Sequence, residues 1–264
     1  MLPSPYMHSR YILSSLLASS LLLGAGCQVR TSAPEAVIPT GEQPRQAQQL
    51  PTVTNTCDHP YYPLRQGTKT TYTSQSGSIN SRFNWEVTAL TPEKATLRYT
   101  FDRGLTMDSD IFCGTDGLLI KSYLNMGSAL AGGSVNAKTI SSSGHFLPSD
   151  LRVGSTWTST YQVETENTNP DAVRLGMRTS QMDLKIENKA LGEESVTVPA
   201  GTFTALKIEA KNTMKMKLGP NLPAVNSTFT TYSYFVRGKG MVKSVTNGVS
   251  GMNSRIEATE IIVP

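Results

Sequence analysis

Residues 82–101 read RFNWEVTALTPEKATLRYTF and contain two stretches in which apolar and polar residues alternate. The apolar positions are Phe83, Trp85, Val87 and Ala89 in the first stretch and Ala95, Leu97, Tyr99 and Phe101 in the second. The sequence Thr91-Pro92-Glu93 between them is typical of a turn. Alternation with a period of two is the pattern of a half-buried strand. The stretch therefore predicts an antiparallel hairpin with one apolar face.

The same alternation recurs along the chain from Cys57 onward. Further apolar positions at this spacing are Trp157, Tyr161 and Val163; Met182, Leu184 and Ile186; Met214, Met216 and Leu218; and Tyr232, Tyr234 and Val236. Short connections favour antiparallel pairing, and amphipathic strands need a second layer or closure. We expect one all-β domain over residues 57–264, with about ten to twelve antiparallel strands in a curved sheet, barrel or sandwich.

Two short motifs occur twice in this domain. Residues 64–71 and 151–158 both read L-R-x-G-[ST]-x-x-T, and GLLIKS at 117–122 is echoed by GMVKS at 240–244. The echoes agree with two related halves, at 60–126 and 146–246, that arose by duplication. They also agree with convergence, because many strands begin after a turn glycine. The Gly- and Ser-rich segment 127–144 would then be a flexible, exposed connection between the halves.

The charge balance of the chain argues against nucleic acid as a partner. It has 264 residues with 24 Lys and Arg against 20 Asp and Glu, a net charge of +4. The basic residues are spread thinly, whereas binding along a phosphate backbone needs clustered cations.

The N-terminal 26 residues have the parts of an export signal. Arg10 precedes an apolar stretch from Tyr11 to Leu23, which is too short to span a bilayer as a helix. The sequence LGAGC at 23–27 then resembles the bacterial lipobox, although Gly24 stands where that motif prefers Leu. The resemblance implies a diacylglycerol on Cys27, cleavage before it and attachment to a membrane. The alternative is an ordinary cleaved signal with an incidental cysteine.

Residue Gln28 follows the cysteine, where some inner-membrane lipoproteins of Gram-negative bacteria carry Asp. The resemblance therefore implies a place in the cell envelope, with the outer membrane or cell surface favoured. Residues 28–56 are rich in Pro and Gln and contain no aromatic residue. Such a composition cannot form a core, so we expect residues 27–56 to be a lipidated, disordered tether.

Two cysteines, Cys57 and Cys113, remain after Cys27 is assigned to lipid. An even number of cysteines in an exported chain favours a disulfide, and two buried thiols are the alternative.

The sequence offers little catalytic or metal-binding chemistry. His59 and His145 lack the spacing of metal ligands, and no G-x-S-x-G nucleophile motif occurs. We therefore expect no catalytic residue, no metal and no cofactor. Methionine suits irregular apolar surfaces, so Met214, Met216 and Leu218 are candidates for lining an apolar ligand site, with residues 214–225 as a lid over it. The alternative is that these methionines only fill the core beside a long hairpin loop.

The stretch SVTVPAGTFTALKIE at 195–209 is similar to the VPAGTF hairpin of uncharacterised bacterial exported and lipoprotein domains. Their YPL-x-x-G segment matches Tyr62–Gly67, and their closing motif matches Gly240–Ser244. The resemblance implies a β-rich fold related to the curved sheets of lipoprotein carriers, and it implies no established activity.

Three functions follow as hypotheses. The first is a membrane-anchored, non-catalytic binding module for an apolar or lipid small molecule. The second is a structural or accessory lipoprotein that binds other envelope proteins. The third, an envelope hydrolase, has no supporting constellation of residues in the sequence.

Overall fold

The structure is a computed structural model that describes residues 56–122, 135–248 and 253–264. The expected signal at 1–26, the lipidated Cys27 and the tether at 27–56 lie outside the described residues, apart from Thr56. Within the described ranges, no helix is long and apolar enough to cross a membrane.

The described chain is almost entirely strand. The first part contains β1 (Asp58–His59), β2 (Tyr62–Pro63), β3 (Lys69–Ser76), β4 (Ile79–Thr91), β5 (Lys94–Phe101), β6 (Thr106–Gly114) and β7 (Gly117–Ile120). The second part contains β8 (Val135–Ser143), β9 (Leu147–Pro148), β10 (Thr156–Asn167), β11 (Thr179–Val198), β12 (Gly201–Lys217), β13 (Ala224–Val236), β14 (Gly240–Asn247) and β15 (Ser254–Ile262). A 3-10 turn, η1 (Asp102–Gly104), and a short helix, α2 (Pro170–Arg174), complete the elements.

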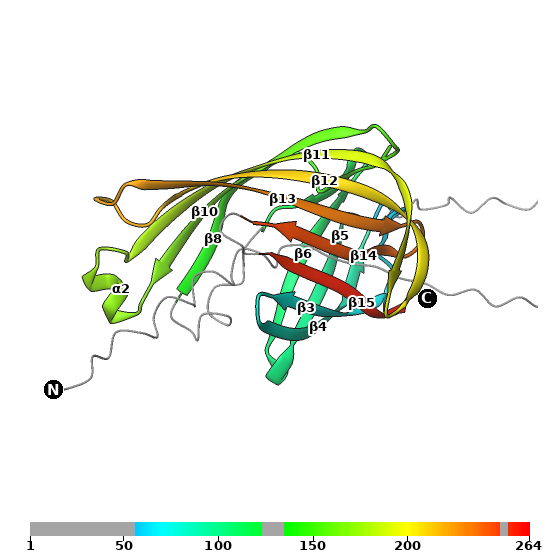
Figure 1. Cartoon of the computed structure of the whole chain (residues 1–264), viewed down its shortest axis with the longest axis horizontal. Coiled ribbons are helices and arrows are strands. Elements are labelled where there is room, and N and C mark those ends of the chain that lie inside the picture. The colour runs from blue at the N-terminus through cyan, green and yellow to red at the C-terminus, as the bar shows by residue number, and fades with distance from the viewer. Residues whose placement is uncertain (1–55, 123–134, 249–252) are drawn as a thin grey trace, which may run out of the picture.

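Thirteen of these strands form one antiparallel sheet, which is curled but not closed into a barrel (Figure 1). Its order is β8-β10-β11-β12-β13-β14-β15-β3-β4-β5-β6-β7-β9. The predicted antiparallel all-β class is confirmed, and of the forms that we expected the structure is the curved sheet. Strand β15 lies at the centre of the order, where it joins β10–β14 to β3–β7.

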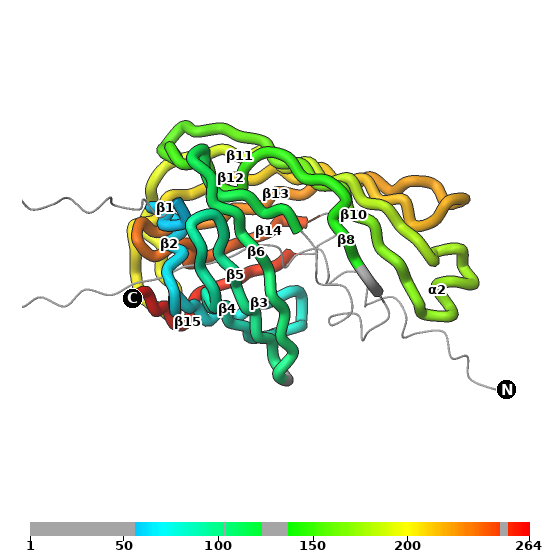
Figure 2. The backbone as a smooth tube through the Cα atoms, turned by 180° about the vertical axis from the view of Figure 1, so that it is seen from behind, coloured from blue at the N-terminus to red at the C-terminus, as the bar shows by residue number. Residues whose placement is uncertain are grey.

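The inner face of the curl carries the main hydrophobic core. We define this face by the parity of Tyr72, Trp85, Leu97 and Ile208, which are all buried. The core draws side chains from β3–β7 on one side of the curl and from β12–β15 on the other. The strands β8 and β10–β13 run on beyond this core toward α2, as Figure 2 shows. The molecule therefore has a core end and an α2 end.

The two edge strands of the sheet, β8 and β9, are joined by residues 144–146 alone. The Phe146 N–H donates to the Leu118 carbonyl at 2.7 Å, and the Ser159 hydroxyl donates to the His145 carbonyl at 2.6 Å. Gly144 has a φ of +77°, and a Cβ at this position would lie 2.0 Å from the backbone carbonyl oxygen of Thr158. This linker thus brings β7 and β10 together at the core end, and only glycine fits where it passes β10.

Part of the segment expected to be a flexible connection is strand. Residues 127–134 lie outside the described residues, but Val135–Ser143 form β8, paired with β10 along its length. The prediction for this part was wrong because the composition is rich in Gly and Ser, whereas β10 offers a complete row of backbone partners. Alternation within the segment places Ala137 against apolar residues of β10–β12.

One face assignment in the opening stretch was also wrong. The predicted hairpin forms, but the register of β4 on β5 shifts between Val87 and Ala89. A β-bulge reverses the parity of the residues that follow it. Leu90 therefore packs against the core, and Ala89 is exposed.

The first of the two echoed motifs forms a tight turn before β3. Gly67 has a φ of +80°, and its N–H donates to the Val87 carbonyl at 3.1 Å. The Thr68 N–H donates to the Arg65 carbonyl at 2.9 Å. The accepting strand β4 has its bulge directly after Val87.

The second echoed motif repeats this arrangement before β10. Gly154 has a φ of +88°, and its N–H donates to the Ala190 carbonyl at 2.8 Å. The Ser155 N–H donates to the Arg152 carbonyl at 3.0 Å, and β11 has its bulge directly after Ala190. The turns at Gly67 and Gly154 therefore share one local structure, while the origin of the two halves by duplication remains a prediction.

Candidate functional site

The inner face of the curled sheet is free of acidic and basic side chains along most of its strands. The register places every Asp, Glu, Lys and Arg of β3–β6, β8, β10 and β12–β15 on the outer face, together with those of residues 179–190 in β11. On the outer face several of these charges pair across strands, as Lys243 does with Glu257 at 3.3 Å. The inner face is therefore apolar, aromatic, hydroxyl or amide in character.

Tyr99 on this face and Tyr62 of β2, which packs in the same core, are ionisable groups that burial keeps neutral. Burial raises the pKa of Tyr62 well above its ordinary value, with smaller contributions from Tyr99 and Tyr72. Burial likewise raises the pKa of Tyr99. Neither phenol carries charge near neutral pH, so the inner face stays uncharged there.

At the α2 end, the inner face carries a second apolar cluster, which we call the α2-end cluster. Its buried members are Tyr161 and Val163 on β10, Met182, Leu184 and Ile186 on β11, and Met214 on β12. Ala137, Ala210 and Met216 pack against them. All of these residues belong to four neighbouring strands of one sheet. No described element outside these strands adds a hydrophobic side chain to the cluster.

The structure brings together two of the three residues predicted to line an apolar site. Met214 and Met216 lie on the inner face of β12, opposite Leu184 and Met182 of β11. Leu218 follows the end of β12, is half-buried and is not a member of the cluster. Residues 214–217 belong to β12 and residues 224 and 225 to β13, so the predicted lid is a hairpin rather than a separate segment.

Sequence reasoning missed the residues of β10 and β11 that complete the cluster. Tyr161, Val163, Met182, Leu184 and Ile186 were recognised as strand residues but not as neighbours of Met214. Their alternation was the available signal. Only the pairing order β10-β11-β12 shows that they share a face with the methionines.

Between the α2-end cluster and the core lies a group of small polar residues, which we call the hydroxyl band. Its members are Thr231 and Ser233 on β13, Ser244 and Thr246 on β14, and Ser254 on β15, and all are buried. Two pairs are hydrogen-bonded across strands: Thr231 with Thr246 at 3.0 Å, and Ser233 with Ser244 at 3.3 Å between their hydroxyl oxygens. The neighbouring buried amide of Asn212 donates to the Ala210 carbonyl at 3.0 Å.

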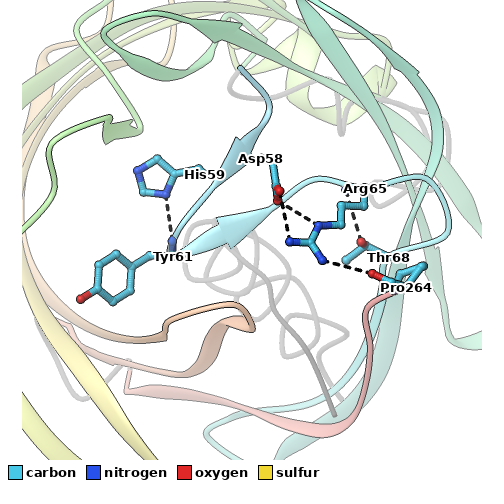
Figure 3. Close-up of polar contacts among 6 residues, drawn as sticks. All are labelled: Asp58, His59, Tyr61, Arg65, Thr68 and Pro264. Carbon is cyan, nitrogen blue, oxygen red and sulfur yellow. Dashed lines mark hydrogen bonds and ion pairs between the residues drawn. The ribbon is translucent and has the colours of Figure 1, made fainter. Parts of the chain in front are cut away.

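The core end of the curl is closed by residues 57–64, which contain β1 and β2 and which we call the plug. Figure 3 shows this hairpin inside the ring of strands of the larger sheet. A disulfide between Cys57 and Cys113 ties the plug to β6, as the cysteine count predicted. The guanidinium of Arg65 donates to both carboxylate oxygens of Asp58, at 3.1 Å each, and to the Pro264 carbonyl at 3.2 Å.

His59 anchors the plug through both ring nitrogens. Its Nδ1 accepts from the Tyr61 N–H at 3.1 Å, so its Nε2 carries the proton and donates to the Pro148 carbonyl at 2.9 Å. Burial lowers the pKa of His59; the bond to Pro148 opposes this shift, and the charge of Arg237 adds to it. His59 is thus a neutral structural residue at this position.

One polar group of the core end lacks a partner. Trp85 lies on the inner face and stacks on Tyr62 of the plug, with ring centroids 6.1 Å apart. Its indole Nε1 is buried and has no hydrogen-bond partner among the described residues. The inner face therefore also offers one unused neutral donor.

The described residues contain no group of three or more His, Cys, Asp and Glu side chains placed to hold a metal ion. His145 lies in the linker 144–146, whose carbonyls accept from Ser159 and Trp157.

Comparison with known proteins gives a family and a fold. A family model described as DUF3108-like matches residues 66–251. No curated protein matches the chain. A solved structure from Bacteroides fragilis, described as an exported protein with a YmcC-like fold, is 14% identical with a TM-score of 0.50, covering 76% of this chain and 98% of that one.

Two further solved structures are similar to the chain. One, described as a lipoprotein from Parabacteroides distasonis, is 14% identical with a TM-score of 0.49, over 77% of this chain and 99% of that one. The other, the hypothetical lipoprotein YmcC from Escherichia coli, is 10% identical with a TM-score of 0.36, over 81% and 91%.

Proposed function

The chain belongs to the DUF3108-like family, and on that premise we propose that it is a lipid-anchored envelope protein that binds an apolar or lipid ligand without catalysis. The observation that carries the proposal is the α2-end cluster. Its apolar side chains share one face of four neighbouring strands, and no described residue of another element adds an apolar partner. A continuous apolar lining of this kind is the chemistry that an apolar ligand site needs.

The membrane anchor in this proposal is Cys27, supported by the lipobox-like sequence before it. Two or three acyl chains would hold the domain stably at a membrane, whereas one chain alone binds reversibly. The fold is that of a Bacteroides protein described as exported, which agrees with a place in the cell envelope. Gln28 after the cysteine favours the outer membrane or the cell surface.

The experiment is purification of the full chain from its native membranes, followed by mass spectrometry of the small molecules extracted from it. Wild type is compared with Met214→Asp, which places a carboxylate in the α2-end cluster. The matched control is Thr213→Asp, which adds the same group one residue away on the exposed outer face. We expect an apolar molecule with wild type and the control, and its loss with Met214→Asp. Equal recovery from all three, or none from wild type, would contradict the proposal.

A second candidate function is contact with another envelope protein through two tips at the α2 end. One tip is the loop that follows α2, and the other is the loop between β12 and β13. Leu175 is 66% exposed and Val225 is 52% exposed. The two tips pack closely, since a Cβ on Gly219 would lie 2.1 Å from the Gly176 oxygen. A photo-crosslinking residue at Leu175, compared with one at exposed Val153, tests this candidate in whole cells. A protein adduct specific to the Leu175 position is expected if this candidate is right.

A further inference from the structure

We propose that the ligand of the inner face is a neutral amphiphile: an acyl chain joined to an uncharged head that carries hydroxyl or ester oxygens. This inference rests on the proposed function and adds the chemistry of the head group. The acyl chain would lie on the α2-end cluster, and the head would lie on the hydroxyl band.

The first argument is the distribution of charge. A carboxylate or phosphate held against the inner face would find no Lys or Arg on that face in the strands described above, because their charged side chains lie on the outer face. The basic residue of β14, Lys243, points outward and is paired with Glu257. An ion without a counter-charge loses much of its hydration free energy on burial. An ammonium head meets the same obstacle, since the carboxylates of β10, of β12–β15 and of residues 179–190 in β11 also lie on the outer face.

The second argument is the hydrogen-bonding capacity of the hydroxyl band. In each of the pairs Thr231–Thr246 and Ser233–Ser244, one hydroxyl donates to the other. Each pair thus uses one of its two O–H donors, and free lone pairs remain on its oxygens. A head with hydroxyl or ester oxygens both accepts and donates such bonds without bringing a charge.

The third argument is the position of the band relative to the cluster. Ala210, Thr231 and Thr246 lie in one row across β12, β13 and β14. Met214 lies four residues further along β12, which is about 13 Å toward the α2 end. A head on the band therefore leaves its chain directed over the cluster toward α2.

The test compares three fluorescent probes with one pyrene-labelled acyl chain and different heads: a glycerol ester, a free carboxylate and a trimethylammonium. Each is titrated into the full chain, purified and cleared of bound lipid, at a pH where the carboxylate is ionised. We expect the ester to bind at least about tenfold more tightly than either charged probe. The affinity of the carboxylate should rise as the pH falls and protonates it, while that of the ester stays constant.

The outcomes separate the two proposals. Equal affinities for the three heads, or tighter binding of a charged probe, would overturn the neutral head and leave the apolar site standing. Binding of none of them would contradict the proposed function itself.

A pair of double variants tests the hydroxyl band directly. Ser233→Ala with Ser244→Ala should weaken the ester about fivefold and leave the carboxylate unchanged, since only the ester uses these groups. The control is Thr197→Ala with Thr202→Ala, which removes a similar pair, with hydroxyl oxygens 3.0 Å apart, from the exposed start of the β11–β12 hairpin. An equal effect of both double variants on the ester would count against the assignment.

Discussion

His59 is held in its neutral form by the two hydrogen bonds that it makes in the plug. Protonation of Nδ1 would replace an acceptor with a donor opposite the Tyr61 N–H. Burial of the ring is the main reason that its pKa is lowered from the ordinary value of 6.5. In the unfolded chain the imidazole titrates near that ordinary value.

The free energy of unfolding should therefore decrease as the pH falls below about 6.5, because the unfolded chain then takes up the proton first. The loss stops growing once the pH is below the lowered pKa of the folded state. Urea denaturation at a series of pH values measures this dependence. His59→Gln keeps an N–H donor for the Pro148 carbonyl and should remove this part of the pH dependence. His145→Gln is the control, and an unchanged pH profile in His59→Gln would contradict the assignment.

At the scale of elements, the two echoed turns should respond alike to the same substitution. Gly67 and Gly154 both have positive φ, and a Cβ at either position meets no close atom: the nearest to Gly67 is Pro264 Cγ at 3.6 Å. Alanine at each site should therefore cost only the backbone penalty, about 1–2 kcal/mol of unfolding free energy. Chemical denaturation measures both values.

The control for this pair is Gly192→Ala. The φ of Gly192 lies outside the left-handed region, and no heavy atom lies within 4 Å of a Cβ placed there. Alanine there should leave stability unchanged or raise it by up to about 1 kcal/mol. A large difference between Gly67→Ala and Gly154→Ala would show that the two turns are not equivalent in energy.

The disulfide between Cys57 and Cys113 closes a long loop, with a sequence separation of 56. Replacing both cysteines with serine should lower the free energy of unfolding by about 4 kcal/mol, through the greater freedom of the unfolded chain. Denaturation of wild type with a reductant should give a similar value. A double variant as stable as the oxidised protein would show that the other contacts of the plug suffice.

Several strands were predictable from the sequence, but local exceptions were not. Alternation around Trp85 and Leu97 locates β4 and β5, whereas the bulge after Val87 depends on the turn at Gly67 that pairs with it. Helix α2 has five residues and no periodicity. Its signal is the cap, where the Asn169 side chain accepts from the Asp171 N–H and Pro170 takes the first helical position.

At the scale of the whole molecule, the two ends of the sheet should differ in local stability. The core end is packed from both sides of the curl, while the α2-end cluster receives apolar side chains from one layer. Amides in residues 180–186 and 212–217 should exchange hydrogen faster than those in 204–210. Hydrogen exchange with mass spectrometry measures these rates, and the glycerol-ester probe should slow the first two segments. Uniform rates along β11 and β12 would contradict this expectation.

The candidate site was predictable only in part, because it depends on which strands are neighbours in the folded sheet. Met214 and Met216 were identified from their chemistry, but the face that they share with Leu184 depends on the order of strands. The hydroxyl band was not identified, because Ser and Thr are common on exposed strands. Its burial follows from long-range pairing of β13, β14 and β15.

The central place of β15 in the sheet affects how the protein is made. Residues 254–262 leave the ribosome after all the other described strands, yet they pair with both β14 and β3. Until they emerge, each half of the nascent chain presents an unsatisfied strand edge to its surroundings, which is a template for aggregation. Holding factors that shield such edges would therefore matter most for this protein in the interval before β15 emerges.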